Sequence, residues 1–343
     1  MGVLVEDEFT RCFQSAEHAP WNWNLYLFPL WVLGILVRHL VLLPVRLLIV
    51  VVGNVLMVLF FFVVCPLVRD RARRLALQKW LLRAYCDMWL ASWGAVVRYH
   101  GIRPRRHANQ VIVANHTTVF DVVLINAQTD TAIIGQKQPG LIGFLQTNFL
   151  SATGGLWFDR KDTHDRSFVA RKLKEHIQCE DNAALLIFPE GTCVNNEYCI
   201  QFKKGAFELG AIIYPVAIKY NRIFCDAFWN SRKQSFVRHI YNLMTSWALV
   251  ADVWYLDPQV IQPGETSVQF AARVKAMIAK KAGLVNVSWD GYLKYFKPND
   301  KLVQDCKRHF ADELRAKLQF RVDNPGVLCS GPPSPPNFRR RIL

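Results

Sequence analysis

The sequence lacks the cysteine patterns that mark disulfide-stapled or zinc-binding proteins. Its nine cysteines are odd in number and scattered, and no C-x-x-C pair occurs. This pattern argues against a disulfide framework and a structural zinc site, and it favours a reducing compartment. Residues 1–24 are polar and mildly acidic; they lack the basic start of a signal peptide, and the apolar run begins too late for one.

Acidic residues are also few. The chain has 343 residues, with 27 Asp and Glu against 42 Lys and Arg, and its net charge is +15. Such an excess predicts an anionic partner. Because we find no zinc-finger spacing, helix-turn-helix signature or RNA-reading motif, the sequence favours membrane lipid or a phosphorylated substrate over nucleic acid.

Charge is missing altogether from Leu47 to Cys65. At about 1.5 Å per residue, this run is long enough to cross a hydrocarbon core of about 30 Å. A shorter apolar run precedes it, and Arg38 and Arg46 lie between the two runs. We therefore predict a membrane hairpin, or one span plus an interfacial helix, over 25–74; a buried soluble hairpin is the alternative. The arginines that follow predict a cytoplasmic location for the rest of the chain.

The pattern of apolar and polar residues changes twice after this segment. Residues 75–99 carry an amphipathic pattern rich in tryptophan and predict a helical linker, packed either at the membrane interface or in the core. Short apolar runs then alternate with amphipathic stretches, which predicts an α/β domain over 100–298. Predicted strands are 111–114, 131–134, 155–158, 184–188 and 214–220; predicted helices are 118–128, 141–150, 166–179, 204–210 and 267–282.

One stretch of the predicted domain joins a strand end to a histidine and an aspartate. His116 follows the strand 111–114, and Asp121 comes five residues later. Five helical residues turn through about 140° net, so the two side chains meet only if the helix begins inside the motif. The carboxylate would then hold one imidazole nitrogen and leave the other as a general base. A surface histidine beside an unrelated capping aspartate is the alternative.

Other polar groups follow other predicted strands. Lys137 follows the strand 131–134, Arg160 ends a glycine-led run, and Glu190, Gly191 and Thr192 form a Pro-Glu-Gly turn, with Lys203 close in sequence. Cations in such loops can bind phosphate, although solvated side chains and an ordinary β-turn explain each feature equally well alone.

Four motifs occur together in one order. N-H-x-x-x-x-D, G-x-x-x-x-R, F-P-E-G-T and the apolar P-V-A-I strand resemble the glycerolipid acyltransferase (PlsC-like) family. Stretches within 188–221, 226–230, 244–247 and 289–291 are similar to the endoplasmic-reticulum glycerol-3-phosphate acyltransferases. The resemblance covers roughly 25–320. It implies a central mixed sheet flanked by helices, with an N-terminal helical membrane anchor.

The resemblance also implies roles for matching residues. His116 would be the general base and Asp121 its orienting partner. Arg160, Glu190, Gly191 and Thr192 would bind glycerol phosphate, and Pro215 and Val216 would lie towards the acyl chain. We add Lys137 and Lys203 as further phosphate contacts on account of their charge. No metal or other cofactor is expected, because no third ligand has a suitable spacing.

The implied reaction transfers a fatty acyl group from acyl-CoA to the sn-1 hydroxyl of glycerol 3-phosphate, giving lysophosphatidic acid for phospholipid and triacylglycerol synthesis. A thioester is already activated, so no covalent enzyme intermediate is required, and backbone N–H groups near the motif are the expected oxyanion donors. The implied location is the endoplasmic reticulum membrane, with the catalytic domain facing the cytosol. A lysophosphatidate acyltransferase and a catalytically silent scaffold for acidic lipids are the alternatives.

Two segments remain after the predicted domain. Residues 299–322 predict a basic amphipathic helix, and residues 323–343, with clustered prolines and arginines, predict a disordered tail.

Overall fold

The computed structural model describes residues 11–15, 24–136, 154–158, 166–180 and 182–295, together with 308, 311, 312 and 315. The chain divides into two compact units, Met1–Val287 and Ser288–Leu343. In the second unit, a short 3-10 helix covers Gly291–Lys294. The predicted helix over 299–322 and tail over 323–343 lie outside the described residues, apart from the four isolated positions.

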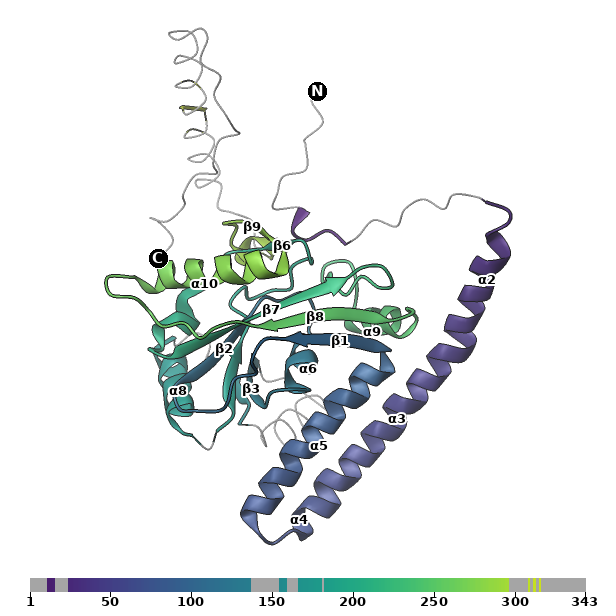
Figure 1. Ribbon diagram of the computed structural model, residues 1–343, viewed down its shortest axis with the longest axis horizontal. Coiled ribbons are helices and arrows are strands. Elements are labelled where there is room, and N and C mark those ends of the chain that lie inside the picture. Colours follow the sequence, from purple (N-terminus) through teal and green to yellow (C-terminus); the bar gives the residue numbers. More distant parts are fainter. Residues whose placement is uncertain are drawn as a thin grey trace. The chain divides into compact units, whose positions relative to one another are not determined.

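A mixed seven-stranded sheet forms the centre of the first unit, as predicted (Figure 1). Its strand order is β1-β8-β7-β2-β5-β3-β4, and all neighbouring pairs are parallel except β7 and β8. The strands are β1 (Ala95–His100), β2 (Gln110–Ala114), β3 (Thr131–Gln136), β4 (Leu156–Phe158), β5 (Ala184–Ile187), β7 (Ile212–Asn221) and β8 (Leu249–Tyr255). Two short strands, β6 (Tyr198–Cys199) and β9 (Val285–Asn286), pair separately.

Helices cover both faces of the sheet. One core cluster joins it to α8 (Arg166–Gln178) and α10 (Ser267–Ala282). A second cluster joins the opposite face to α6 (Asp121–Asn126), α9 (Phe236–Met244) and the end of α5 (Arg71–Ser92). Every residue of β2 is buried, as its unbroken apolar run predicts for a strand covered on both faces.

Local signals fix the ends of the best-predicted helices. Thr266 and Gln269 form a capping box before α10, and Gly283 ends that helix with a φ of +60°. Predicted helix 204–210 is a 3-10 helix over Lys204–Glu208, and predicted helix 141–150 lies outside the described residues. The sequence reasoning missed β1, β8 and α9.

The N-terminal apolar region is one continuous helix, so a hairpin within 25–74 is wrong. It runs from Phe28 to Leu67 and is long and apolar enough to cross a membrane, with little of it buried in the protein. Pro44 lies in the first turn of α3 (Leu43–Leu59), directly after a π-helical stretch over Val37–Leu42. A π-helical stretch changes the local hydrogen-bond spacing, which lets the chain pass a proline without turning back.

The actual hairpin is formed by this helix and α5, which pack side by side (Figure 1). Asp70 caps the start of α5 by accepting from the Arg73 N–H. The predicted helical linker over 75–99 is therefore wrong at both ends, since α5 begins earlier and residues from Ala95 onward form β1. The tryptophans of this stretch differ in burial: Trp93 is fully buried, and Trp80 is exposed.

Buried Arg46 joins the long helix to α9. Its guanidinium donates to the carbonyl oxygens of Met244, Ser246 and Trp247 at 2.6–2.9 Å. These carbonyls lie at or just beyond the C-terminal end of α9, where a helix leaves acceptors unsatisfied. The charge that interrupts the apolar sequence thus attaches the helix to the sheet domain.

Candidate active site

His116 and Asp121 meet at the carboxyl end of β2. The imidazole Nδ1 lies 2.9 Å from the Asp121 Oδ2. As predicted, the helix starts inside the motif: His116 lies on the turn, and α6 begins at Asp121. Because an ionised carboxylate only accepts hydrogen bonds, Nδ1 carries a proton and donates it to Asp121. The arrangement can leave Nε2 to accept a proton from a ligand.

The Asp121 carboxylate is fully buried and has four donors. Oδ2 accepts from the backbone N–H groups of Thr117 and Thr118, at 2.7 and 3.0 Å, as well as from His116. Oδ1 accepts from the Tyr220 hydroxyl at 2.5 Å. A buried charge needs such compensation, and here it also fixes the orientation of the group that orients the imidazole.

The His116 ring is largely enclosed. It stacks on Phe188, with ring centroids 4.3 Å apart, and its side chain is 15% exposed. Burial acts to lower the pKa of His116, but the adjacent Cys193 and the Asp121 carboxylate more than offset it, so the pKa is raised to about 10. The ring is therefore a strong base once it loses its second proton.

Glu190 holds the backbone of the same turn. Its two carboxylate oxygens accept from the backbone N–H groups of His116, at 2.6 Å, and Ile200, at 3.1 Å. Burial raises the pKa of Glu190 to about 7, even though these two donors act to lower it. The predicted phosphate-binding residue is thus bound to the turn that carries His116.

Two asparagine side chains extend the pairing of β7 beyond the last residue of β2. Asn115 accepts from the Ile218 N–H at 2.8 Å and donates to the Ile218 carbonyl at 2.9 Å. Asn196 forms the same pair of bonds with the backbone of Tyr220. These amides replace backbone partners and hold Tyr220 in place to reach Asp121.

A second, uncharged histidine supports the motif from the α9 side. The Nε2 of His239 and the Thr118 hydroxyl share a 2.9 Å hydrogen bond, and the ring stacks on Phe120. Burial lowers the pKa of His239 to about 4, so it is neutral at physiological pH. Its role in the structure is to fix the loop between His116 and Asp121.

The predicted phosphate-binding residues divide into two groups. Gly191 lies in the turn after β5 with a φ of +68°, and a Cβ there would come within 3.0 Å of the Lys203 Nζ. Thr192 is buried, and Lys203 is exposed beside this turn. Lys137 and Arg160 lie outside the described residues. The structure thus brings Glu190, Gly191, Thr192 and Lys203 together next to His116.

Pro215 and Val216 lie deep in the sheet. They pair with Val113 and Ala114 of β2, and the Val216 side chain is fully buried. In the structure these two residues are part of the sheet core, and their predicted contact with an acyl chain stays a prediction.

Three N–H groups of the motif already have acceptors within the turn, and the expected oxyanion donors stay a prediction. The N–H of His116 donates to Glu190, and those of Thr117 and Thr118 donate to Asp121. All three groups serve the internal geometry of the turn. Within the described parts of the chain, no three His, Cys, Asp or Glu side chains converge as metal ligands.

Sequence reasoning missed Tyr220, Phe188 and His239. Tyr220 and Phe188 occupy strand ends next to motifs that were recognised, so their position was a usable signal. His239 had none, because α9 itself was not predicted.

The sheet, the strand-end His–Asp pair and the Pro-Glu-Gly turn define an acyltransferase-type site. The profile of the family described as Acyltransferase matches residues 96–219. Glycerol-3-phosphate acyltransferase 3 of Rattus norvegicus is 38% identical over 99% of this chain and 77% of its own length. Glycerol-3-phosphate acyltransferase 4 of Homo sapiens is 38% identical over 91% of this chain and 70% of its own.

A solved structure, the 1-acyl-sn-glycerophosphate (LPA) acyltransferase PlsC from Thermotoga maritima, is 16% identical with a TM-score of 0.49, and the match covers 69% of this chain and 96% of that one. On the evidence of the full-length relatives, the chain belongs to the glycerolipid acyltransferase family.

Proposed function

We propose that this protein transfers an acyl group from acyl-CoA to the sn-1 hydroxyl of glycerol 3-phosphate, giving lysophosphatidic acid. The names of relatives that align over most of both chains support this acceptor. The single observation that carries the chemistry is the His116–Asp121 pair, buried, oriented and next to a turn with a cation.

In this mechanism His116 is the general base. Its Nε2 takes the proton of the acceptor hydroxyl as the oxygen attacks the thioester carbonyl, and Asp121 stabilises the imidazolium that forms. The tetrahedral intermediate then expels the CoA thiolate, which takes the proton from the imidazolium. The new ester bond replaces the thioester bond, no redox change occurs, and neither a metal nor a covalent enzyme intermediate is needed.

The acceptor phosphate would be held by cations around the Pro-Glu-Gly turn. We propose Arg160, Lys203 and Lys137 as its charged contacts, with Gly191 and Thr192 shaping the turn. We assign Glu190 a positioning role instead, because a carboxylate repels phosphate and both of its oxygens already accept from backbone N–H groups.

Membrane placement follows from what lies on each side of the long helix. Cys12 precedes it, yet the Cys12 carbonyl accepts from Asn195 of the domain that follows it. The chain therefore returns to the side from which it entered. Arginines between Arg69 and Arg74, at the turn of the hairpin, are costly to move across a bilayer, so the hairpin enters the membrane without carrying its turn to the far side. We propose that the hairpin inserts from the cytosolic face of the endoplasmic reticulum membrane; an N-terminal tag inaccessible to antibody after selective plasma-membrane permeabilisation would contradict this.

The acceptor assay tests the proposal directly. Purified protein is given labelled acyl-CoA and either glycerol 3-phosphate or lysophosphatidate, in separate reactions. We expect turnover with glycerol 3-phosphate and release of one CoA thiol per product formed. Turnover with lysophosphatidate and none with glycerol 3-phosphate would contradict the proposed function and would indicate a lysophosphatidate acyltransferase.

A further inference from the structure

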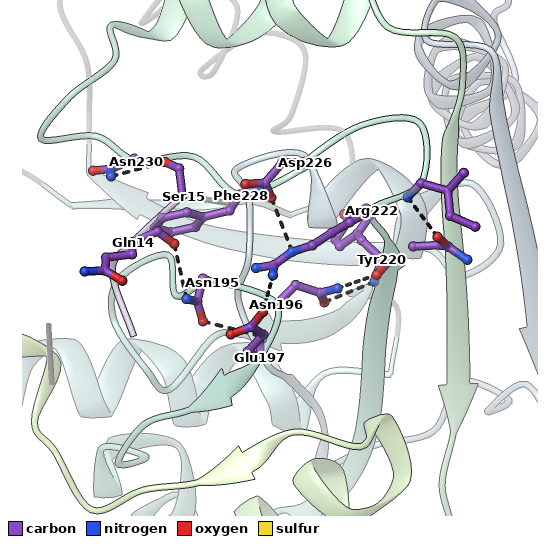
Figure 2. Close-up of polar contacts among 12 residues, drawn as sticks. Gln14, Ser15, Asn195, Asn196, Glu197, Tyr220, Arg222, Asp226, Phe228 and Asn230 are labelled. Atoms are coloured by element: carbon purple, nitrogen blue, oxygen red, sulfur yellow. Dashed lines mark hydrogen bonds and ion pairs between the residues drawn. The ribbon is translucent and has the colours of Figure 1, made fainter. Parts of the chain in front are cut away.

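The N-terminal segment Arg11–Ser15 is bound to the catalytic domain, although the sequence predicts only a polar terminus there. Cys12 is fully buried, and Phe13 is 8% exposed. We call residues 11–15 the N-terminal clip. Two asparagines from different loops hold its backbone, Asn195 and Asn230, and Figure 2 shows both at the clip.

Asn195 makes three hydrogen bonds to the clip. Its backbone N–H donates to the Cys12 carbonyl at 2.9 Å, and its side-chain amide donates to the carbonyls of Arg11, at 2.6 Å, and Gln14, at 3.2 Å. Asn195 is itself buried. All three acceptors are backbone carbonyls, so these hydrogen bonds depend on the path of the clip backbone.

Asn230 holds the same segment from the other side. Its side-chain amide donates to the Phe13 carbonyl at 3.1 Å. It also lies 3.4 Å from the Ser15 hydroxyl (Figure 2). The clip therefore bridges a loop at 194–197 and a loop at 226–230. The first loop precedes β7 in the sequence and the second follows it.

Each of these loops also contacts the catalytic turn, one residue before its clip contact. The Val194 N–H donates to the His116 carbonyl at 2.8 Å, and the Trp229 N–H donates to the Thr117 carbonyl at 3.3 Å. Two consecutive residues in each loop thus connect the clip to the two residues whose backbone sets the position of the imidazole.

Arg222 forms a second bridge between the loops. Its guanidinium pairs with Glu197 in the first loop and lies 3.8 Å from Asp226 in the second (Figure 2). A partly exposed ion pair stabilises weakly. The clip adds buried apolar area and five hydrogen bonds to this bridge, so it constrains the loops more strongly than the ion pair does.

We propose that the N-terminal clip is a positioning element of the active site: it fixes the loops at 194–197 and 226–230, and through them the His116–Thr117 turn. The inference rests on the proposed role of His116 as base. A displacement of about 1 Å at a reacting group is enough to reduce a rate by about 10²-fold, so loss of the clip reduces kcat. The proposed substrate contacts do not include the clip, so KM for both substrates stays near the value of the intact protein.

The test compares three forms of the full protein in detergent: intact, lacking residues 1–15, and carrying Phe13→Asp. Phe13→Leu is the matched control, since it keeps an apolar side chain at this position. We expect kcat to fall by about 10- to 100-fold in the truncated protein and in Phe13→Asp, with KM changed less than about threefold. In the Phe13→Leu control, kcat stays near the value of the intact protein. A peptide of residues 1–24, added to the truncated protein, restores kcat, whereas the same peptide with Phe13→Asp does not.

Hydrogen exchange separates this inference from the proposed function. The backbone N–H groups of Val194 and Trp229 exchange at least about tenfold faster in the truncated protein than in the intact one, whichever acceptor the enzyme uses. Full kcat and unchanged exchange after truncation would overturn the proposal, and so would failure of the peptide to restore either quantity. Asn221→Asp, on the exposed end of β7, controls for an added negative charge and leaves both unchanged.

Discussion

Tyr220 donates its hydroxyl proton to Asp121 from a position 99 residues further along the chain. The phenol is buried, lies in β7 and aims across the end of the sheet at the carboxylate that holds His116. The imidazole is thus oriented by a carboxylate that is itself held by a strand, two backbone amides and the start of a helix. Geometry fixed this firmly makes the site sensitive to small changes.

Replacing His116 by alanine tests whether the pair is catalytic. We expect activity to fall by roughly 10²–10⁴-fold or more, because the acceptor hydroxyl loses its base. Acyl transfer by purified, folded protein is the measurement, and His100→Ala, at a surface ion pair with Asp252, is the control. Full activity in the His116 variant would favour a silent lipid-binding scaffold.

Asp121→Asn changes the basicity of His116. The ring accepts a proton only when neutral, and the carboxylate helps to raise its pKa to about 10. The variant lowers that pKa, so the rise of kcat/KM with pH moves to lower pH, while the plateau falls by roughly 10²–10⁴-fold because the ring loses its orienting partner. Rate profiles between pH 6 and 10.5 measure both effects. An unchanged midpoint would mean that Asp121 does not set the basicity.

The free energy of unfolding should decrease with rising pH. Glu190 has a pKa raised from 4.5 to about 7 by burial, so its stabilising contribution is complete below pH 4.5 and is lost as pH rises to 7. Glu190→Gln removes this pH-dependent contribution to the free energy of unfolding. It also leaves one backbone N–H without its acceptor, at a cost of about 1–3 kcal/mol. Thermal unfolding at several pH values from 4.5 to 7 is the measurement. A variant that keeps the slope of the intact protein would contradict the assignment.

Arg160→Ala should act on acceptor binding. We expect the KM for glycerol 3-phosphate to rise by about tenfold or more, since a charge-assisted contact to phosphate is lost, while the KM for acyl-CoA changes little. The control is Arg171→Ala, an exposed arginine of α8 that pairs with Glu175. If Arg160→Ala and Arg171→Ala have the same KM for glycerol 3-phosphate, Arg160 does not bind the acceptor.

Arg46→Met should loosen the long helix from the domain. Three carbonyls at the end of α9 lose their donor, at about 1–3 kcal/mol for each buried group left unsatisfied. A lower Tm in detergent is expected. Arg38→Met is the comparison, because Arg38 donates within its own helix and stacks over Trp247 without capping α9. Equal Tm values for the two variants would show that Arg46 does not anchor the helix.

The sequence predicted the local part of the site well. A buried apolar strand is followed by His116, and Asp121 comes five residues after the histidine. With this spacing, the two side chains can meet only if a helix begins inside the motif. The structure meets that condition with α6 starting at Asp121. Short-range spacing, strand periodicity and helix caps are properties of adjacent residues, so they can be read along the chain.

Prediction failed where the deciding contact lies far away in the chain. Arg38, Pro44 and Arg46 suggested a break between two apolar runs, but the helix continues because Arg46 finds its acceptors about 200 residues later. Residues 11–15 were expected to be a polar terminus and instead join two loops next to His116. The contact between Glu190 and the His116 backbone was not expected either, and the predicted phosphate contact of Glu190 stays a prediction.

By itself, then, the sequence determined the α/β class, the pairing of His116 with Asp121 and the order of the motifs, because each depends on residue type and spacing within a few turns or strands. Only the tertiary structure decided what surrounds that pair. A buried carboxylate must be compensated by whichever donors the fold brings to it, and here those include Tyr220 from β7, whose arrival depends on sheet order and on the Asn115 and Asn196 bonds to that strand.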